Sequence, residues 1–314
     1  MGIKSVVLAF GLTVFGFSAA AQVVIATIPV GSAASLVAVD RASDLIYVSN
    51  AGDNTVSVID GESNAVIETD AVSGYPQAVS ANPTLDRIYI GSFSTADISV
   101  INGKTNKVTN VSMSSTPTIT GLAANPTTGL VYGCNESKDV VVLNGNNNKV
   151  GPAVNIPNCG FGVGVNPQTN LIYFATFTPN VTVVNGSTNK VVQTFPLDLT
   201  GAVTVAVDAK SNRYGVVDTN AGKLEISNAS NGKLLGTVTG LNRPFGAVFL
   251  PGGKQALVTE ESGNDLAFID ATNYTVINRT TVGNFPLGLD YNPATHLAYV
   301  VNATDDTVSV VEIP

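Results

Sequence analysis

The sequence predicts an all-β fold, a seven-bladed β-propeller with four antiparallel strands in each blade. Three observations carry this prediction. A pattern recurs about every 42 residues, each copy contains four short runs of strand-forming residues, and the two chain ends supply complementary parts of one incomplete copy. They predict a single domain over residues 22–314, in which the N-terminal strand closes the last blade.

One apolar position marks the period. It recurs at intervals of 42, 43, 41, 41, 43 and 42 residues, at Tyr47, Tyr89, Tyr132, Tyr173, Tyr214, Leu257 and Tyr299. A polar turn residue follows the same period, at Asp60, Asn102, Asn144, Asn185, Asn228 and Asp270. Because two separate positions keep one period, the copies are structural repeats.

The second copy shows the four strands of a repeat. It reads QAVSAN, RIYIGS, DISVIN and KVTNVS over residues 77–82, 87–92, 97–102 and 107–112, with polar turns between them. Such short runs, rich in Val, Ile and Tyr and separated by Asn-Gly turns, are typical of antiparallel strands. Four strands in about 42 residues is the spacing of a propeller blade.

The chain ends predict how the ring closes. The last copy stops at TVSVVEIP, residues 307–314, and lacks its fourth strand. The segment VVIATIPVG at 23–31 resembles AVIETDAVSG at 65–74, which is the fourth strand of the first copy. We therefore expect the N-terminal strand to complete the last blade, as in a closed ring without exposed sheet edges.

The first 21 residues are read as a signal peptide. Lys4 precedes an apolar run from Val6 to Phe17 and then Ala19-Ala20-Ala21, which predicts cleavage near Ala21 and Gln22. The alternative is an apolar helix retained in the fold. The run is short for a bilayer and no other apolar stretch is long enough, so we expect a periplasmic or extracellular protein without a membrane span.

The charge of the chain limits the classes of partner that it can bind. The formal net charge is −8, only 12% of residues are charged, and no basic patch is present. Such a surface repels phosphate backbones, which argues against nucleic-acid binding.

Several motifs carry a family resemblance. YVSN at 47–50 and YVVN at 299–302, together with NPATHLAY and TVSVID, resemble the YVTN-repeat β-propeller family, the YncE-like secreted proteins. The resemblance covers residues 23–314 and implies a propeller fold. DNA binding occurs within that family, but the charge of this chain argues against it here.

We call the four strands of each repeat a, b, c and d in chain order. A candidate binding surface lies where the loops before strand a meet the loops between strands b and c, and we call this side of the ring the top face. In-register positions give Tyr75, Arg243 and Phe285, and the neighbouring loops hold Glu260, Glu261, Asp305 and Asp306. We expect this sector to bind a protein, a glycan or a small ligand. The alternative is that these are ordinary solvated loops.

The acidic residues raise the question of a bound cation. Hard cations such as Ca²⁺ take oxygen ligands from carboxylates and loop carbonyls. The spacing matches no calcium motif, so solvated surface charge is the alternative, and no cofactor is predicted.

The two cysteines, Cys134 and Cys159, lie on the top side of adjoining repeats. An even count in an oxidising compartment predicts a disulfide between them. Two buried small apolar side chains are the alternative.

Catalytic residues are scarce. The single histidine, His296, belongs to a loop on the opposite face, and the chain has no tryptophan, whereas propeller lactonases, lyases and quinone dehydrogenases rely on channel histidines, metal ligands or tryptophans. The sequence favours a non-catalytic recognition module. The alternative is a propeller hydrolase or lactonase with a metal-assisted or carboxylate-based site, using Glu260 or Asp306.

Asp290, in a row of small residues along the channel, is either a channel ligand or a hydrogen-bonded structural residue. A closed ring gives no reason for obligate assembly, so we expect a monomer.

Overall fold

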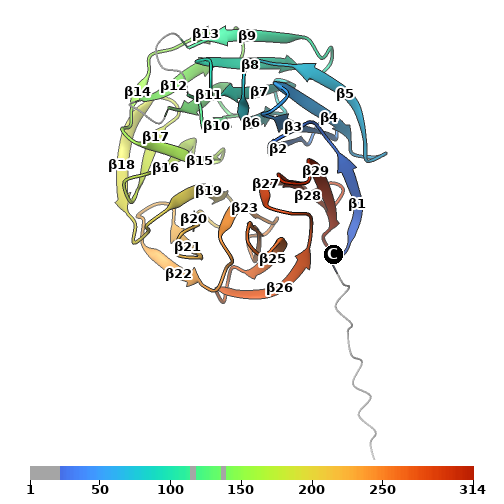
Figure 1. Ribbon diagram of the computed structural model, residues 1–314. Coiled ribbons are helices and arrows are strands. Elements are labelled where there is room, and N and C mark those ends of the chain that lie inside the picture. The colour runs from blue at the N-terminus through green and yellow to red at the C-terminus, as the bar shows by residue number, and fades with distance from the viewer. Residues whose placement is uncertain (1–21, 114–117, 136–138) are drawn as a thin grey trace, which may run out of the picture.

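The computed structural model describes residues 22–113, 118–135 and 139–314, and the predicted signal peptide at 1–21 lies outside this part. All regular elements of the described chain are strands. They form seven antiparallel sheets arranged as blades around a central axis (Figure 1). The predicted seven-bladed β-propeller is therefore confirmed.

Strands a to d run from the axis to the rim of each blade. Blade 1 contains β2 (Ala34–Asp40), β3 (Leu45–Asn50), β4 (Thr55–Asp60) and β5 (Ala65–Ala71); blade 2 contains β6 (Pro76–Asn82), β7 (Arg87–Ser92), β8 (Asp97–Asn102) and β9 (Val108–Ser112). Blade 3 contains β10 (Gly121–Ala124), β11 (Leu130–Cys134), β12 (Asp139–Asn144) and a divided outer strand, β13 (Lys149–Val150) and β14 (Val154–Asn155); blade 4 contains β15 (Cys159–Asn166), β16 (Leu171–Thr176), β17 (Asn180–Asn185) and β18 (Lys190–Pro196).

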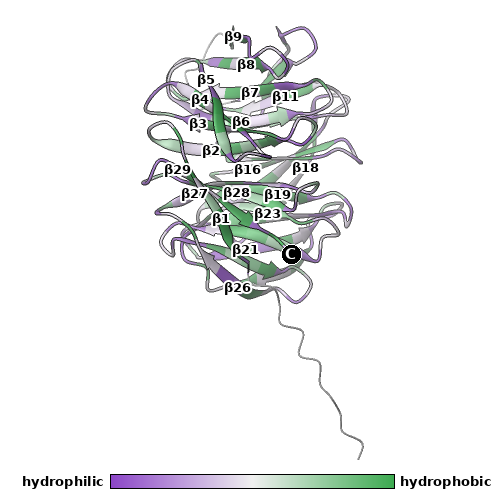
Figure 2. Ribbon diagram, turned by 90° about the vertical axis from the view of Figure 1, so that its right-hand side faces the viewer, coloured by the Kyte–Doolittle hydropathy of each residue, from purple (hydrophilic) through white to green (hydrophobic). Residues whose placement is uncertain are grey.

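Blade 5 contains β19 (Ala202–Asp208), β20 (Arg213–Asp218), β21 (Lys223–Asn228) and β22 (Leu234–Val238); blade 6 contains β23 (Pro244–Phe249), β24 (Gln255–Glu260), β25 (Asp265–Asp270) and β26 (Thr275–Thr281). Blade 7 contains β27 (Pro286–Asn292), β28 (Leu297–Asn302), β29 (Thr307–Glu312) and β1 (Val24–Pro29). In the side view, hydrophobic strands lie between hydrophilic loops at the two faces of the ring (Figure 2).

Both ends of the chain build blade 7. Strand β1 pairs with β29 in antiparallel register, with Thr27 opposite Ser309 and Ile28 opposite Val308. The N-terminal strand thus takes the outer position that the last repeat leaves empty. The closure predicted from the complementary ends is confirmed.

The repeated tyrosine on strand b packs between blades. The six tyrosines of this position are fully buried: Tyr47, Tyr89, Tyr132, Tyr173, Tyr214 and Tyr299. Two of them reach the c-to-d turn of the next blade, where the Tyr132 hydroxyl donates to Asn189 Oδ1 (2.7 Å) and the Tyr173 hydroxyl donates to the Ala229 carbonyl (3.2 Å). Gly145 occupies such a turn because a Cβ there would collide with the Tyr89 hydroxyl. The period in the sequence therefore reflects the contact between neighbouring blades.

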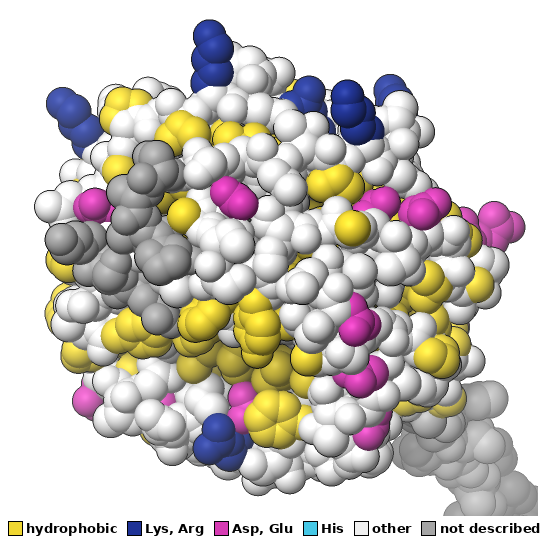
Figure 3. Space-filling view, turned by 45° about the horizontal axis from the view of Figure 1, so that its top comes forward, with side chains coloured by type: hydrophobic (Ala, Val, Ile, Leu, Met, Phe, Trp, Pro, Cys, Tyr) yellow, Lys and Arg dark blue, Asp and Glu magenta, His cyan; other side chains and the backbone are white. Residues whose placement is uncertain are grey.

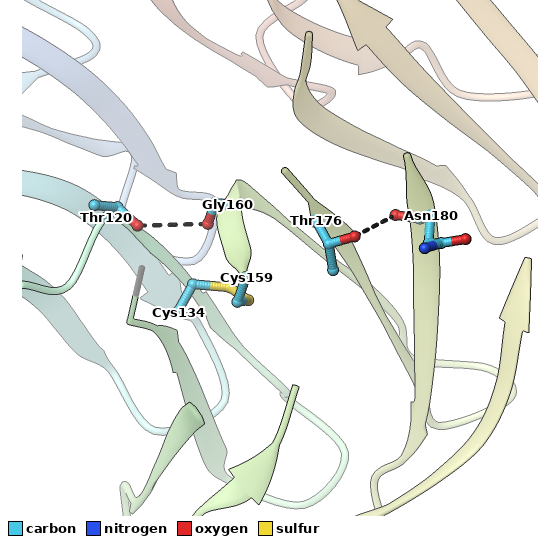
Figure 4. The surroundings of a disulfide bond; sticks show 6 residues. All are labelled: Thr120, Cys134, Cys159, Gly160, Thr176 and Asn180. Carbon is cyan, nitrogen blue, oxygen red and sulfur yellow. Dashed lines mark hydrogen bonds between the residues drawn. A yellow bond between two sulfur atoms is a disulfide. The ribbon is translucent and has the colours of Figure 1, made fainter. Parts of the chain in front are cut away.

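A disulfide joins blades 3 and 4. Cys134 ends β11 and Cys159 begins β15, their Cα atoms lie 5.4 Å apart, and both side chains are buried (Figure 4). The predicted pairing is confirmed, and such a bond is typical of an oxidising compartment. The disulfide links blade 3, whose outer strand is divided, to blade 4.

Removing this disulfide should destabilise the ring. Cross-linking a loop of 25 residues restricts the unfolded chain and contributes about 3 kcal/mol. We expect Cys134→Ser/Cys159→Ser to lower the free energy of unfolding by that order, measured by urea unfolding. Wild type with dithiothreitol is the control and should fall to the same value; equal stability of the variant and the oxidised wild type would contradict the prediction.

The buried tyrosines predict loss of stability in alkali. Burial raises the pKa of Tyr89, Tyr132, Tyr173 and Tyr299 to about 12, whereas an unfolded tyrosine ionises near pH ~10. The folded state favours the neutral phenol, so the stabilisation is complete below pH ~10 and is lost as the pH rises through about 12.

Absorbance at 295 nm and circular dichroism should therefore show tyrosine ionisation and unfolding together. Tyr299→Phe is a suitable control, because the Tyr299 hydroxyl has no hydrogen-bond partner in the described structure. This variant should match wild type at pH 7 and unfold at a higher pH. Tyrosines that ionise near pH ~10 with unchanged dichroism would show that the rings are accessible.

Candidate functional site

The top face carries the d-to-a loops that enter each blade and the b-to-c loops beside them. Hydrophobic side chains gather around the middle of this face, with acidic side chains and few cations around them (Figure 3). Tyr75, Arg243 and Phe285 each directly precede strand a of a blade, namely blades 2, 6 and 7. The predicted sector therefore lies on one face, and it spans four consecutive blades around the ring.

These three residues share an unusual backbone. Tyr75, Arg243 and Phe285 have φ values of 52°, 51° and 55°, in the left-handed region. Ala33 takes the same conformation at the entry to blade 1, with φ of 50°. Large side chains disfavour this region, because Cβ approaches the following carbonyl oxygen.

Hydrogen bonds from the loops hold the left-handed residues. The carbonyl of Tyr75 accepts the N–H of Phe93 (2.9 Å), and that of Phe285 accepts the N–H of Ala303 (3.1 Å). In turn, the N–H of Tyr75 donates to Asn54 Oδ1 (2.6 Å) and the N–H of Phe285 donates to Asn264 Oδ1 (3.1 Å). Both asparagines belong to the b-to-c loop of the preceding blade, so each bulky residue is fixed by two blades at once.

The side chains fixed in this way point away from the core. Tyr75 is 46% exposed, Phe285 is 41% exposed, and the Arg243 side chain is 56% exposed. Arg243 Nε donates to Glu261 Oε2 at 3.0 Å. The loops thus present two aromatic rings and one guanidinium group to solvent.

Glu260 is engaged inside blade 6. It is fully buried, its Oε2 accepts from Arg279 Nε at 2.6 Å, and its Oε1 accepts the N–H of Asn242 at 2.7 Å. The hydrogen bond with Glu260 raises the pKa of Arg279. Glu260 therefore fixes the d-to-a loop before Arg243 and is not open to solvent.

The acids of blade 7 have a similar role. Asp305 accepts from the Asn284 N–H (2.7 Å) and from Asn284 Nδ2 (2.9 Å), and these hydrogen bonds lower the pKa of Asp305. Asp306 Oδ1 accepts the N–H of Ala34 at 3.4 Å. The described residues contain no group of three or more His, Cys, Asp or Glu side chains placed to hold a metal ion. The sequence-based expectation that no cofactor is bound, with Ca²⁺ as the alternative, stays a prediction.

Four phenylalanines extend the aromatic surface beyond the residues found from the sequence. Tyr75 contacts Phe93 with ring centroids 5.8 Å apart, and Phe161 contacts Phe177 and Phe245 at 5.9 and 6.4 Å. Phe161 and Phe245 line a cavity of about 170 Å³ in the channel. Phe161 and Phe245 occupy the same position of their repeats, where other repeats have residues such as Ser35 or Thr120, and this departure is the signal that the sequence contains.

The bottom face carries the a-to-b and c-to-d turns and opens into a wider cavity of about 470 Å³. Asp290 lies in its wall, where Oδ1 accepts from Arg41 Nη2 (2.9 Å) and Oδ2 accepts the N–H of Val39 (2.9 Å). Asp290 is thus hydrogen-bonded across the seam between blades 7 and 1. His296 is in the a-to-b loop of blade 7, on the same face, with Nδ1 at 3.4 Å from the Tyr291 hydroxyl.

Comparison with known proteins identifies the fold only. No family model and no curated protein matches the chain. A solved chain of the Kuenenia stuttgartiensis hydrazine synthase is similar, with a TM-score of 0.77 and 12% identity, over 90% of this chain and 96% of that one. The described residues include no helix that is long and apolar enough to span a membrane.

Because Phe285 has a left-handed backbone, its ring can be removed without an expected loss of stability. Phe285→Gly relieves the strain of a bulky residue at positive φ, which offsets the added entropy of the unfolded chain. We expect the free energy of unfolding to stay unchanged or rise by up to about 1 kcal/mol. Ala33→Gly, at the same backbone conformation, is the matched control. If Phe285→Gly were less stable than Ala33→Gly by well over about 1 kcal/mol, the Phe285 ring would have a structural role.

Proposed function

We propose that this protein is a secreted or periplasmic, non-catalytic recognition module that binds a protein partner through its top face. The observation that carries the proposal is the presence of bulky side chains at exposed, left-handed positions. Each costs about 1 kcal/mol relative to a favourable backbone, and Tyr75 and Phe285 remain more than two-fifths exposed. Strain held at an exposed position is typical of residues that contact another molecule.

The chemistry of the face favours a protein over a glycan or a small ligand. Phe161 and Phe245 line a small apolar cavity, while Tyr75, Phe177 and Phe285 are exposed on the same face. Aromatic residues around a central pocket are typical anchors of protein interfaces. An apolar side chain of the partner would enter the cavity, and the exposed rings would surround it.

The charge of this protein indicates which residues flank the apolar side chain of the partner. The chain has a formal net charge of −8, and its exposed top loops include Asp53 and Asp305. A partner with Lys or Arg beside its apolar residue would be attracted over a longer range than the contacts themselves. We therefore infer a basic peptide or loop with an apolar centre.

The compartment and the motifs support the same proposal. The Cys134–Cys159 disulfide fits an oxidising environment, and the apolar N-terminal segment has the pattern of an export signal. The YVSN and YVVN motifs support membership of the YVTN-repeat propellers, a family of secreted proteins. A monomeric ring would leave the whole top face free.

The hydrolase or lactonase alternative has less support. It requires a carboxylate that can exchange protons with a substrate. Both oxygens of Glu260 accept hydrogen bonds inside blade 6, and the residue is fully buried. Asp306 is half-buried and lies near the N–H of Ala34.

Selection from a phage-displayed library of random 12-residue peptides would test the proposal. We expect peptides with an apolar residue flanked by Lys or Arg, and we expect Phe285→Gly and Phe245→Ala to weaken their binding at least about tenfold, or about 1.4 kcal/mol. Fluorescence anisotropy of labelled peptides gives the affinities.

Two controls make this result specific. Ala33→Gly shares the backbone of Phe285→Gly without loss of an aromatic ring, and Arg41→Gln alters the opposite face. Both should bind the selected peptides as wild type does. Peptides that bind all four variants equally, or none that bind at all, would contradict a recognition site on the top face.

A further inference from the structure

The wide cavity at the bottom of the channel has the character of a separate ligand site. Its volume of about 470 Å³ is within the range of small-molecule sites. An adjoining cavity of about 430 Å³ shares Arg41, Val207 and Ala209 with it. The bottom cavity is thus larger than the top cavity, and Val37, Val79 and Leu289 line both, where they meet in the channel.

The wall of the bottom cavity is apolar and rigid. Valine and alanine side chains from strands a of several blades form the sides, and Pro83, Pro126 and Pro167 lie at the rim. The proline ring fixes φ and removes a backbone donor. Most of this wall therefore offers an aliphatic chain apolar contacts, and Ser80, which also lines it, already accepts the N–H of Ala124 at 3.0 Å.

One guanidinium group interrupts this wall. At the position of Arg41, five of the other six repeats have proline and blade 5 has Ala209. The Arg41 side chain is 47% exposed. Nε donates to the Tyr291 carbonyl (3.2 Å) and Nη2 donates to Asp290 Oδ1 (2.9 Å). Within the described residues Nη1 has no hydrogen-bond partner, so the group retains donors for a ligand.

The acids near Arg41 are already occupied. Asp290 also accepts the N–H groups of Val39 (2.9 Å) and Tyr291 (2.8 Å). Asp208, in the adjoining cavity, is buried and forms an ion pair with Arg213 at 2.9 Å. Lys210, in the same cavity wall, is exposed and has no ion pair among the described residues. At this opening, the positively charged groups of Arg41 and Lys210 therefore outnumber the carboxylates that are free to bind another group, although the whole chain is acidic.

We propose that the bottom cavity binds a small amphipathic carboxylate, with its aliphatic part against the Val, Ala and Pro wall and its carboxylate on Arg41, near Lys210. Guanidinium groups bind carboxylates through charge-assisted hydrogen bonds. This proposal does not depend on the proposed protein-binding face, because Arg41 and Lys210 lie at the other end of the channel and are not part of the wall of the top cavity.

Octanoate is a suitable probe, with 1-octanol as the matched ligand that has the same chain and no charge. Isothermal titration calorimetry on the full protein should detect octanoate binding, and 1-octanol should bind at least about tenfold more weakly, or about 1.4 kcal/mol. Equal affinities would overturn the role of the carboxylate, and no heat with octanoate would overturn the site.

Three variants locate the site. Ala209→Trp places an indole where the two cavities meet and should abolish binding. Arg41→Gln should weaken octanoate binding about tenfold and leave 1-octanol unchanged. Asp290→Asn removes the competing carboxylate beside Arg41, so octanoate affinity should rise at least about threefold; a purely structural role for this ion pair would lower it.

The top-face variant Phe245→Ala is the control for position. It should bind octanoate as wild type does, while it loses the selected peptides. Loss of octanoate binding in Phe245→Ala, or normal binding in Ala209→Trp, would overturn the bottom site without affecting the test of the top face. Thermal unfolding of each variant shows that the ring is intact.

Discussion

The pairing of the first strand with the last is the interaction on which the rest of the structure depends. Each blade buries its apolar side chains against two neighbours, so an open arc would leave two blade surfaces in water. The β1–β29 pairing places blade 7 beside blade 1, and there Ile28, Val37 and Tyr299 share one buried cluster. Because the channel is enclosed only when all seven blades meet, both cavities also depend on this closure.

The polar loops of the top face position the aromatic residues. Asn54 and Asn264 each bond the backbone of a residue that enters the next blade, and Glu260 fixes the loop before Arg243. These hydrogen bonds stabilise a left-handed backbone that bulky residues would otherwise avoid. The acidic groups that resemble a ligand site in the sequence are therefore part of the support for the exposed side chains.

The sequence predicts the fold well because the fold is periodic. Seven copies in one register determine the strands, the closure and the side of the ring on which each loop lies, and the cysteine positions follow from them. Tyr75, Arg243 and Phe285 could be found in this way, because they occupy one position of the repeat.

The repeat pattern does not predict the side-chain contacts of the candidate site. Glu260 bonds Arg279, which is specific to blade 6 and follows no repeat position. The contact between Phe161 and Phe245 joins blades 4 and 6, which are not neighbours in the ring. Such contacts depend on how side chains meet across the axis, and a one-dimensional period does not specify that.

Departures from the repeat are informative where two of them meet. Arg41 stands where five of the other six repeats have proline, and Asp290 replaces a small residue in the strand a row. They come from opposite ends of the chain and form one ion pair of 2.9 Å at the seam between blades 7 and 1. A partly buried hydroxyl suffices at the equivalent position of blade 2, where Ser80 Oγ accepts the N–H of Ala124 at 3.0 Å. Linking adjacent strands a therefore does not require a charge, and the ion pair gives the bottom opening a polarity that blade packing alone does not need.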